Sequence, residues 1–169
     1  MRILPALAAT ILLLAAPALA AAAQSLQVTS PAFASGEAIP LRYSAYGDNN
    51  RPPISWTPVR GAKAYAIALW DPDVPMTHPF VHWIAWNIPG SAHALPEGSL
   101  SDMVQGRNGL GRQSYFGPRP PSGTHHYHFQ VFALDAPLSL AADANFSALR
   151  AAMQGHVLAQ GELVGTYAH

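Results

Sequence analysis

Proline and glycine interrupt this 169-residue chain at short intervals, and they constrain its fold more than any other feature. The sequence contains 16 prolines and 13 glycines, residues that end or bend regular secondary structure. Between them lie short runs in which apolar residues alternate with small or polar ones. Such runs, bounded by turn residues, are typical of strands in an all-β sandwich or barrel. We therefore expect a mostly β fold.

Several segments carry this strand pattern. The most regular is Ala64–Trp70, where large apolar side chains alternate with small ones before the chain turns at Asp71-Pro72. Period-two alternation of this kind indicates a strand with two distinct faces. The other predicted strands are Val81–Asn87 and Tyr127–Leu134, and, from weaker patterns, Leu26–Val28, Ile39–Tyr43 and Glu162–Tyr167.

One helix is expected near the end of the sequence. Phe146, Leu149, Met153 and Val157 recur at helical spacing after Asn145, a residue type that favours the N-cap. Gly155 indicates that the helix ends early. A long connection, Ser91–Gly123, precedes the third predicted strand, and loops of that length in compact domains are usually functional or disordered.

The first 23 residues have the features of a secretory signal peptide. Arg2 is followed by an apolar run, Ile11–Leu14, and then by small residues that suit cleavage after Ala20 or Ala23. An uncleaved anchor helix is the alternative, but the apolar run is shorter than the roughly 20 residues of a membrane span. We expect residues 24–169 to form one periplasmic or secreted domain without a stable membrane anchor.

Composition excludes several classes of function. The sequence has no cysteine, so disulfides, thiol chemistry, zinc–thiolate sites and acylation of a lipoprotein cysteine are unavailable. Nine basic residues balance nine acidic ones and Lys63 is the only lysine, so no basic stripe can follow a nucleic-acid backbone. The eight histidines include several close neighbours, and we looked there for a site.

The first candidate site segment is Asp71-Pro72-Asp73-Val74-Pro75, where an apolar strand meets a loop. The prolines fix φ near −65° and limit the freedom of the turn, so two carboxylates project at a strand end. The alternative interpretation is a tight turn in which Asp71 caps backbone amides. The motif alone does not separate the two.

The second candidate is His82, inside the next predicted strand. Parity in a regular strand puts it on the same side as Ile84 and Trp86. Such a histidine could be a core residue, or, if Asp71 lies beside it, a ring held by the carboxylate with one nitrogen free for a ligand or metal.

The third candidate is the Pro/Gly-rich segment from Gly117 to Tyr127. Parity places His125 and Tyr127 on one face of the following strand and His126 and His128 on the other. An apolar face that begins with a histidine and a tyrosine suits a pocket mouth at a sheet edge, with loop amides available to an anion. Alternatively, the two side chains simply complete the core.

Ordered motifs along the chain add a resemblance to a known family. The motifs are Asp71-Pro-Asp-Val-Pro75, His82-Trp83, Trp86-Asn-Ile-Pro89, Gly106-Arg-Asn-Gly109, Tyr115-Phe-Gly-Pro118, Pro120-Pro121, His125-His-Tyr-His-Phe129 and Gly161-Glu-Leu-Val-Gly-Thr-Tyr167. Over nearly all of residues 24–169 the chain resembles the phosphatidylethanolamine-binding protein family, in its bacterial Raf-kinase-inhibitor-like branch. One departure is Arg119, where bacterial relatives commonly have a small residue or cysteine.

The resemblance implies a β-sandwich with a central antiparallel sheet, one or two peripheral helices, and a pocket for phosphate-like anions or phosphorylated headgroups. The residues that match the family's pocket are Asp71, Asp73, His82, Gly117, Pro118, Pro120, His125 and Tyr127. Neither a cofactor nor a bound metal is expected. Arg119 would either strengthen anion capture or point to solvent.

We expect a protein that binds a small anion and that could also act on a protein partner. The sequence leaves the oligomeric state open, with a homodimer as one possibility. An enzyme is the first alternative, with His82 or His125 as general base and Asp71 orienting it. No Gly-x-Ser-x-Gly elbow or cysteine supplies a nucleophile. The second alternative, an inhibitor of a protease or kinase, rests on the resemblance alone.

Overall fold

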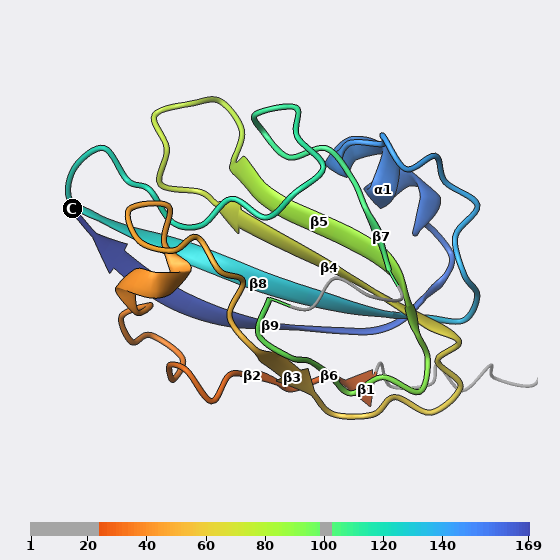
Figure 1. Cartoon of the computed structure of the whole chain (residues 1–169). Coiled ribbons are helices and arrows are strands. Elements are labelled where there is room, and N and C mark those ends of the chain that lie inside the picture. The colour runs from red at the N-terminus through yellow and green to blue at the C-terminus, as the bar shows by residue number, and fades with distance from the viewer. Residues whose placement is uncertain (1–23, 99–102) are drawn as a thin grey trace, which may run out of the picture.

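The computed structural model describes residues 24–98 and 103–169, and its main element is a six-stranded sheet (Figure 1). The strand order is β1 (Gln24–Ser25), β9 (Val157–Ala168), β8 (Thr124–Leu134), β4 (Ala64–Asp71), β5 (Phe80–Pro89) and β7 (Val104–Gln105). All neighbouring pairs are antiparallel except β1 and β9, which are parallel. The predicted mostly β fold is confirmed, whereas the predicted signal peptide lies outside the described residues.

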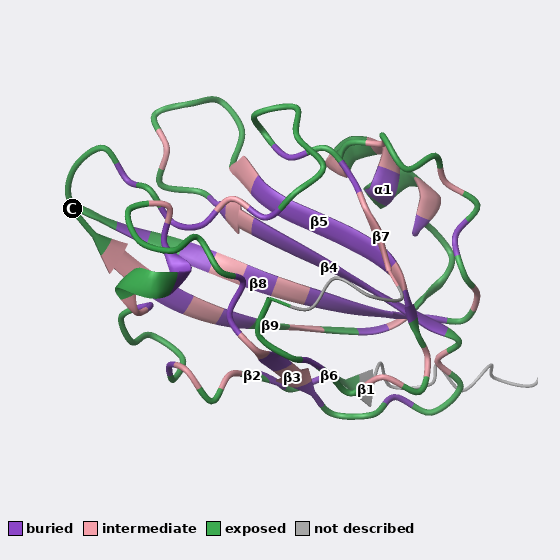
Figure 2. Cartoon of the chain, in the orientation of Figure 1, coloured by how far each residue is buried: buried purple, intermediate pink, exposed green. Residues whose placement is uncertain are grey.

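A second sheet of three short strands packs against one face of the large sheet. It consists of β2 (Val28–Thr29), β3 (Ile54–Trp56) and β6 (Ala94–Leu95), all antiparallel. Between the two sheets lies the main core, to which β4 contributes Tyr65, Ile67 and Leu69. These side chains are the large members of the alternating pattern, and Figure 2 shows that the middle of β4, β5 and β8 is buried.

The opposite face of the large sheet is partly covered by helix α1 (Phe146–Ala152) and its flanking loops (Figure 1). Leu149 and Met153 pack there against the small side chains of β4 in a second core. The side chain of Asn145 accepts a hydrogen bond from the Ala148 amide at 3.0 Å, so the predicted N-cap is confirmed. Val157 is not part of the helix: Gly155 has φ +80°, and the chain then enters β9.

Two of the weaker strand predictions are wrong. Ile39–Tyr43 contains a 3₁₀ helix, η1 (Leu41–Tyr43), since Ile39 donates one backbone hydrogen bond to the edge of β9 and the next residue, Pro40, has no N–H to continue. Leu26–Val28 is also not one strand, because β1 ends before it and β2 begins at its last residue.

Three other differences concern short elements. The long connection Ser91–Gly123 contains β6 and β7, and β3 lies in a segment for which we predicted no strand. Strands of two or three residues are too short to show an alternating pattern. No helix in the described part of the chain has the length and apolar character needed to cross a membrane.

The loops that carry the predicted site gather at one end of the large sheet. The β4–β5 connection, the segment leading into β8 and the region of η1 all lie at this end, where the chain also finishes (Figure 1). Residues far apart in the sequence are thereby brought together above the main core.

Candidate functional site

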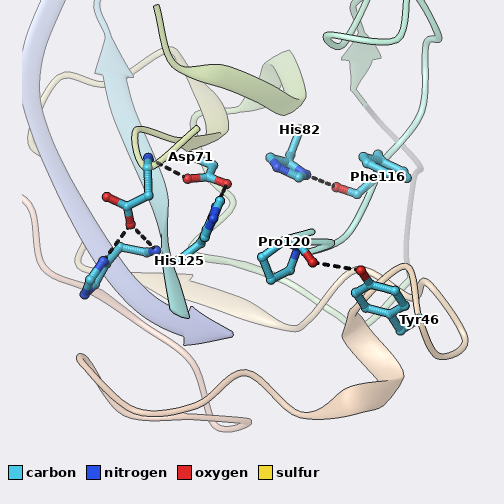
Figure 3. Close-up of polar contacts among 8 residues, drawn as sticks. Tyr46, Asp71, His82, Phe116, Pro120 and His125 are labelled. Atoms are coloured by element: carbon cyan, nitrogen blue, oxygen red, sulfur yellow. Dashed lines mark hydrogen bonds and ion pairs between the residues drawn. The ribbon is translucent and has the colours of Figure 1, made fainter. Parts of the chain in front are cut away.

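The centre of the candidate site is a buried pair formed by Asp71 and His125. Asp71 is the last residue of β4 and His125 the second residue of β8, and these strands are neighbours in the sheet. Nδ1 of His125 donates to Oδ2 of Asp71 at 2.7 Å (Figure 3). The residues are 2% and 7% exposed. The carboxylate fixes the proton on Nδ1, so Nε2 is the nitrogen left for a ligand.

Asp71 also holds the turn that follows it. Its second oxygen, Oδ1, accepts a hydrogen bond from the Asp73 amide at 2.8 Å. Asp71 therefore caps the turn, as in the alternative interpretation of the sequence, and its carboxylate also orients a histidine at the strand end.

His82 reaches the same site, but not by the parity we predicted. Leu69 pairs with Trp83, whereas the next residue of β4, Trp70, pairs with Val81, so the register shifts and His82 is the extra residue of a β-bulge. The bulge turns His82 away from the side of Ile84. The His82 ring instead contacts Tyr127, edge to face, at 5.2 Å between centroids. The predicted shared face with Ile84 and Trp86 is wrong.

The surroundings of His82 keep its ring neutral. It stacks on Phe116 and touches the edge of Phe80, and Nδ1 donates to the Phe116 carbonyl at 2.8 Å (Figure 3). Burial lowers the pKa of His82 to about 4, although the hydrogen bond to the Phe116 carbonyl acts in the opposite direction. Since Nδ1 carries the proton, Nε2 carries the lone pair. Asp71 thus orients His125 and not His82.

A cavity of about 220 Å³ lies between these groups and the proline-rich loop. Four of the predicted site residues line it: Asp71, His82, Pro120 and His125. The others that line it are Val74, Phe80, Leu110, Phe116, Arg119 and Pro121. Phe80, Leu110 and Phe116 were not predicted as site residues, because loop residues such as Phe116 and Leu110 follow no periodic pattern. The available sequence signal for Phe80 was its position at the start of a strand, two residues before His82.

Three predicted residues lie behind the wall of the cavity. Tyr127 is fully buried, and its hydroxyl lies near the Asp71 carboxylate without a hydrogen bond of standard geometry among residues 24–98 and 103–169. Burial raises its pKa far above the usual value, so the phenol stays protonated. Gly117 donates its amide to Oδ1 of Asn49 at 2.8 Å, and a Cβ there would collide with the Tyr43 carbonyl. The buried Pro118 follows it in the same loop.

Asp73 points away from the cavity. Its Oδ2 accepts from both the backbone amide and Nδ1 of His126, each at 2.7 Å. Partial burial acts to raise the pKa of Asp73, but the hydrogen bonds from His126 outweigh it and the pKa is lowered. Asp73 therefore fastens the β4–β5 turn to β8 instead of facing a ligand. The opposite faces predicted for His125 and His126 are confirmed.

The chemistry of the cavity follows from this set of groups. In the described ranges no three histidine or acidic side chains are arranged to hold a metal ion. The residues that line the cavity include no serine, threonine or cysteine. What the cavity offers is an imidazole backed by a carboxylate, a neutral imidazole, one guanidinium and apolar walls.

Comparison with known proteins agrees with this architecture. The model of the phosphatidylethanolamine-binding protein family matches residues 29–168. A UPF0098 protein of Pyrococcus horikoshii is 44% identical over 154 residues, which cover 85% of this chain and 76% of the relative. LppC of Mycobacterium tuberculosis, named as a candidate lipoprotein, is 38% identical over 151 residues, covering 88% and 75% of the two chains.

Two solved structures share the fold. A phosphatidylethanolamine-binding protein homologue from Chlamydia trachomatis superposes with a TM-score of 0.82 at 38% identity, covering 86% of this chain and 98% of the other. YbcL of E. coli, described as a member of the mammalian family, gives 0.80 at 28% identity and covers 86% and 99%. The chain belongs to the phosphatidylethanolamine-binding protein family.

Proposed function

We propose that this protein is an exported binding protein that takes a small anion, such as phosphate or a phosphorylated headgroup, in the cavity between Asp71, His82 and His125. The observation that carries the proposal is the Asp71–His125 pair. Nδ1 of His125 is bonded to the buried Asp71 carboxylate, so the imidazolium form of the ring has its Nε2–H available to donate to an anion in the cavity.

The other groups complement this donor. Nε2 of the neutral His82 is an acceptor, which suits the P–OH of a partly protonated phosphate or the ammonium of a headgroup. The apolar walls exclude water and strengthen each polar contact inside the cavity. A cavity of about 220 Å³ limits the occupant to a small group, so a larger ligand would insert only its head.

Calorimetric titration with phosphate, phosphoethanolamine and phosphotyrosine tests the assignment. We expect binding at up to about millimolar concentration, and its loss in His125→Ala. The matched control is His156→Ala, which removes an imidazole from another His–Asp pair, bonded to Asp135 at 2.7 Å and not lining the cavity. No binding to the wild type, or equal binding by His125→Ala, would contradict the proposal.

Catalysis is the second candidate, favoured by the same pair, because a carboxylate-oriented imidazole can act as a general base. It would have to activate water, since the lining residues carry no hydroxyl or thiol nucleophile. Turnover of p-nitrophenyl esters or phosphate that disappears in His125→Ala would favour it over binding alone.

Export and a protein partner are further parts of the proposal. The pattern of residues 1–23 and the name of the mycobacterial relative support export. We expect expressed protein in the periplasm or medium, with mass spectrometry locating its first residue at Ala21 or Gln24.

A protein partner is tested by pull-down from periplasmic extract with and without phosphate. Phosphate would compete with a partner that binds at the cavity and would leave a partner that binds elsewhere unaffected.

A further inference from the structure

Arg119 occupies a fixed position at the cavity although its side chain is exposed. It stands between Pro118 and Pro120, both buried, and proline restricts its own φ and the conformation of the residue before it. The Ala45 amide donates to the Pro118 carbonyl at 3.0 Å, and the Tyr46 hydroxyl donates to the Pro120 carbonyl at 2.7 Å (Figure 3). The backbone of Arg119 is therefore anchored on both sides.

The guanidinium itself rests on an aromatic ring. Cζ of Arg119 lies 5.3 Å from the centroid of Tyr46, and the same ring stacks on His169 at 4.2 Å with an interplanar angle of 9°. A cation–π contact occupies none of the guanidinium N–H groups. These donors are available to a ligand in the cavity, since Arg119 is also one of the residues that line it.

The charges of the groups around the cavity show why the Arg119 guanidinium matters for anion binding. Asp71 is the one acidic residue among the described residues that line the cavity, and it carries a negative charge that opposes any anion. His82 is neutral because its pKa is about 4, and Tyr127 behind the wall is neutral as well. Arg119 forms no ion pair with a carboxylate in the described part of the chain. It is the permanent positive charge of the cavity.

We propose that Arg119 is a specificity-determining residue, which makes the cavity select doubly charged phosphomonoesters over singly charged anions of the same shape. This inference rests on the proposed anion-binding function. The charge of Asp71 offsets that of a protonated His125, so the attraction for an anion depends on Arg119. This attraction grows with the charge of the anion, and a dianion therefore gains more from Arg119 than a monoanion does. The planar fork of arginine suits two oxygens of one phosphate, and the flanking prolines and Tyr46 hold it in place.

Methyl phosphate and methyl sulfate are the appropriate probes, because they have the same shape and differ in charge above about pH 7, where a phosphomonoester is mostly a dianion. Wild-type protein is expected to bind methyl phosphate more tightly in calorimetry at about pH 8. Arg119→Gln should weaken methyl phosphate about 10- to 100-fold, the range for a hydrogen bond between charged groups, and methyl sulfate by much less.

Two variants separate the charge from its placement. Arg119→Lys keeps the charge but loses the fork, so it should recover part of the preference. Tyr46→Leu keeps Arg119 but removes both the ring beneath it and the hydroxyl on Pro120, and it should also reduce the preference. The melting temperature of each variant is compared with that of the wild type. Arg119→Gln should have the wild-type melting temperature, because the position is exposed.

The outcomes distinguish this inference from the function on which it rests. If the wild type binds neither probe, the proposed anion site itself fails. If the wild type binds both and His125→Ala binds neither, but Arg119→Gln keeps the wild-type ratio of the two affinities within about twofold, the anion site stands and the role of Arg119 is overturned. A tenfold or larger fall in that ratio supports it.

Discussion

Acid is expected to destabilise this protein through His82 in particular. In the folded protein burial lowers the pKa of His82 to about 4, whereas the usual value of 6.5 applies when the chain is unfolded. As the pH falls, the unfolded chain takes up a proton before the folded one does. The contribution of His82 to stability is therefore complete above pH 6.5 and is lost progressively as the pH falls to about 4.

The size of this effect follows from the two values. One pKa unit corresponds to about 1.4 kcal/mol, so the difference between 6.5 and about 4 corresponds to about 3 kcal/mol of unfolding free energy. Solvent screening does not reduce it much, since His82 is 3% exposed. The loss is a large fraction of the roughly 5–15 kcal/mol that stabilises an ordinary domain.

Urea unfolding of wild type and His82→Asn, followed by tryptophan fluorescence from about pH 7.5 to about pH 4, isolates the contribution. The asparagine amide can still donate to the Phe116 carbonyl but cannot titrate. Near neutral pH the variant should be less stable, because it leaves a gap between the Phe80, Phe116 and Tyr127 rings. By about pH 4 the difference should have moved by about 3 kcal/mol in the variant's favour.

Replacing an exposed histidine is the control. His93→Asn removes an imidazole that is already in contact with water, so its curve should run parallel to that of the wild type. Wild-type and His82→Asn curves that stay parallel within about 0.5 kcal/mol would refute the reasoning. So would an NMR titration of the folded wild type in which the His82 ring protonates near its usual pKa, a test that does not depend on the variant folding.

Three further substitutions test the surroundings of the site. Gly117→Ala should cost about 1–3 kcal/mol in urea unfolding and weaken anion binding, because the added Cβ collides with the Tyr43 carbonyl; unchanged stability would contradict the packing. Asn145→Ala should lower stability by about 1 kcal/mol through loss of the α1 cap, with binding unaltered. Tyr127→Phe removes a buried hydroxyl that makes no hydrogen bond of standard geometry in the described residues, so calorimetric unfolding should show no destabilisation; a loss above about 1 kcal/mol would reveal a hydrogen bond, for example to Asp71.

The placement of His125 and Tyr127 could be predicted from the sequence because β8 pairs with β9 without interruption at that end. Each residue of β8 from Thr124 to Ala133 faces one residue of β9, so alternation alone assigns the faces. His82 shows the limit of the same reasoning. A bulge inserts one residue opposite Trp70, and the local sequence carries no mark of it, so parity fails beyond that point.

The walls of the cavity were harder to predict than its polar centre. Asp71 and His125 stand at strand ends, whereas Phe116 and Leu110 reach the cavity through loop backbone that has no period. The failed strand at Ile39–Tyr43 has a similar origin, because Pro40 ends a pairing that the apolar residues favour. The structure at these positions depends on tertiary contacts and on the absence of a backbone N–H at proline. A pattern of apolar residues does not contain this information.

The two oxygens of Asp71 couple ligand binding in the cavity to a backbone amide outside it. One accepts from the His125 ring and the other from the Asp73 amide, so any change in the ring is felt by that amide through a single carboxylate. An anion that accepts from Nε2 would make the ring a weaker donor at Nδ1, so Asp71 would keep more of its negative charge and the hydrogen bond from the Asp73 amide would strengthen. The Asp73 amide resonance should therefore move during a titration although Asp73 does not line the cavity. One backbone signal would thus report occupancy without a label in the site.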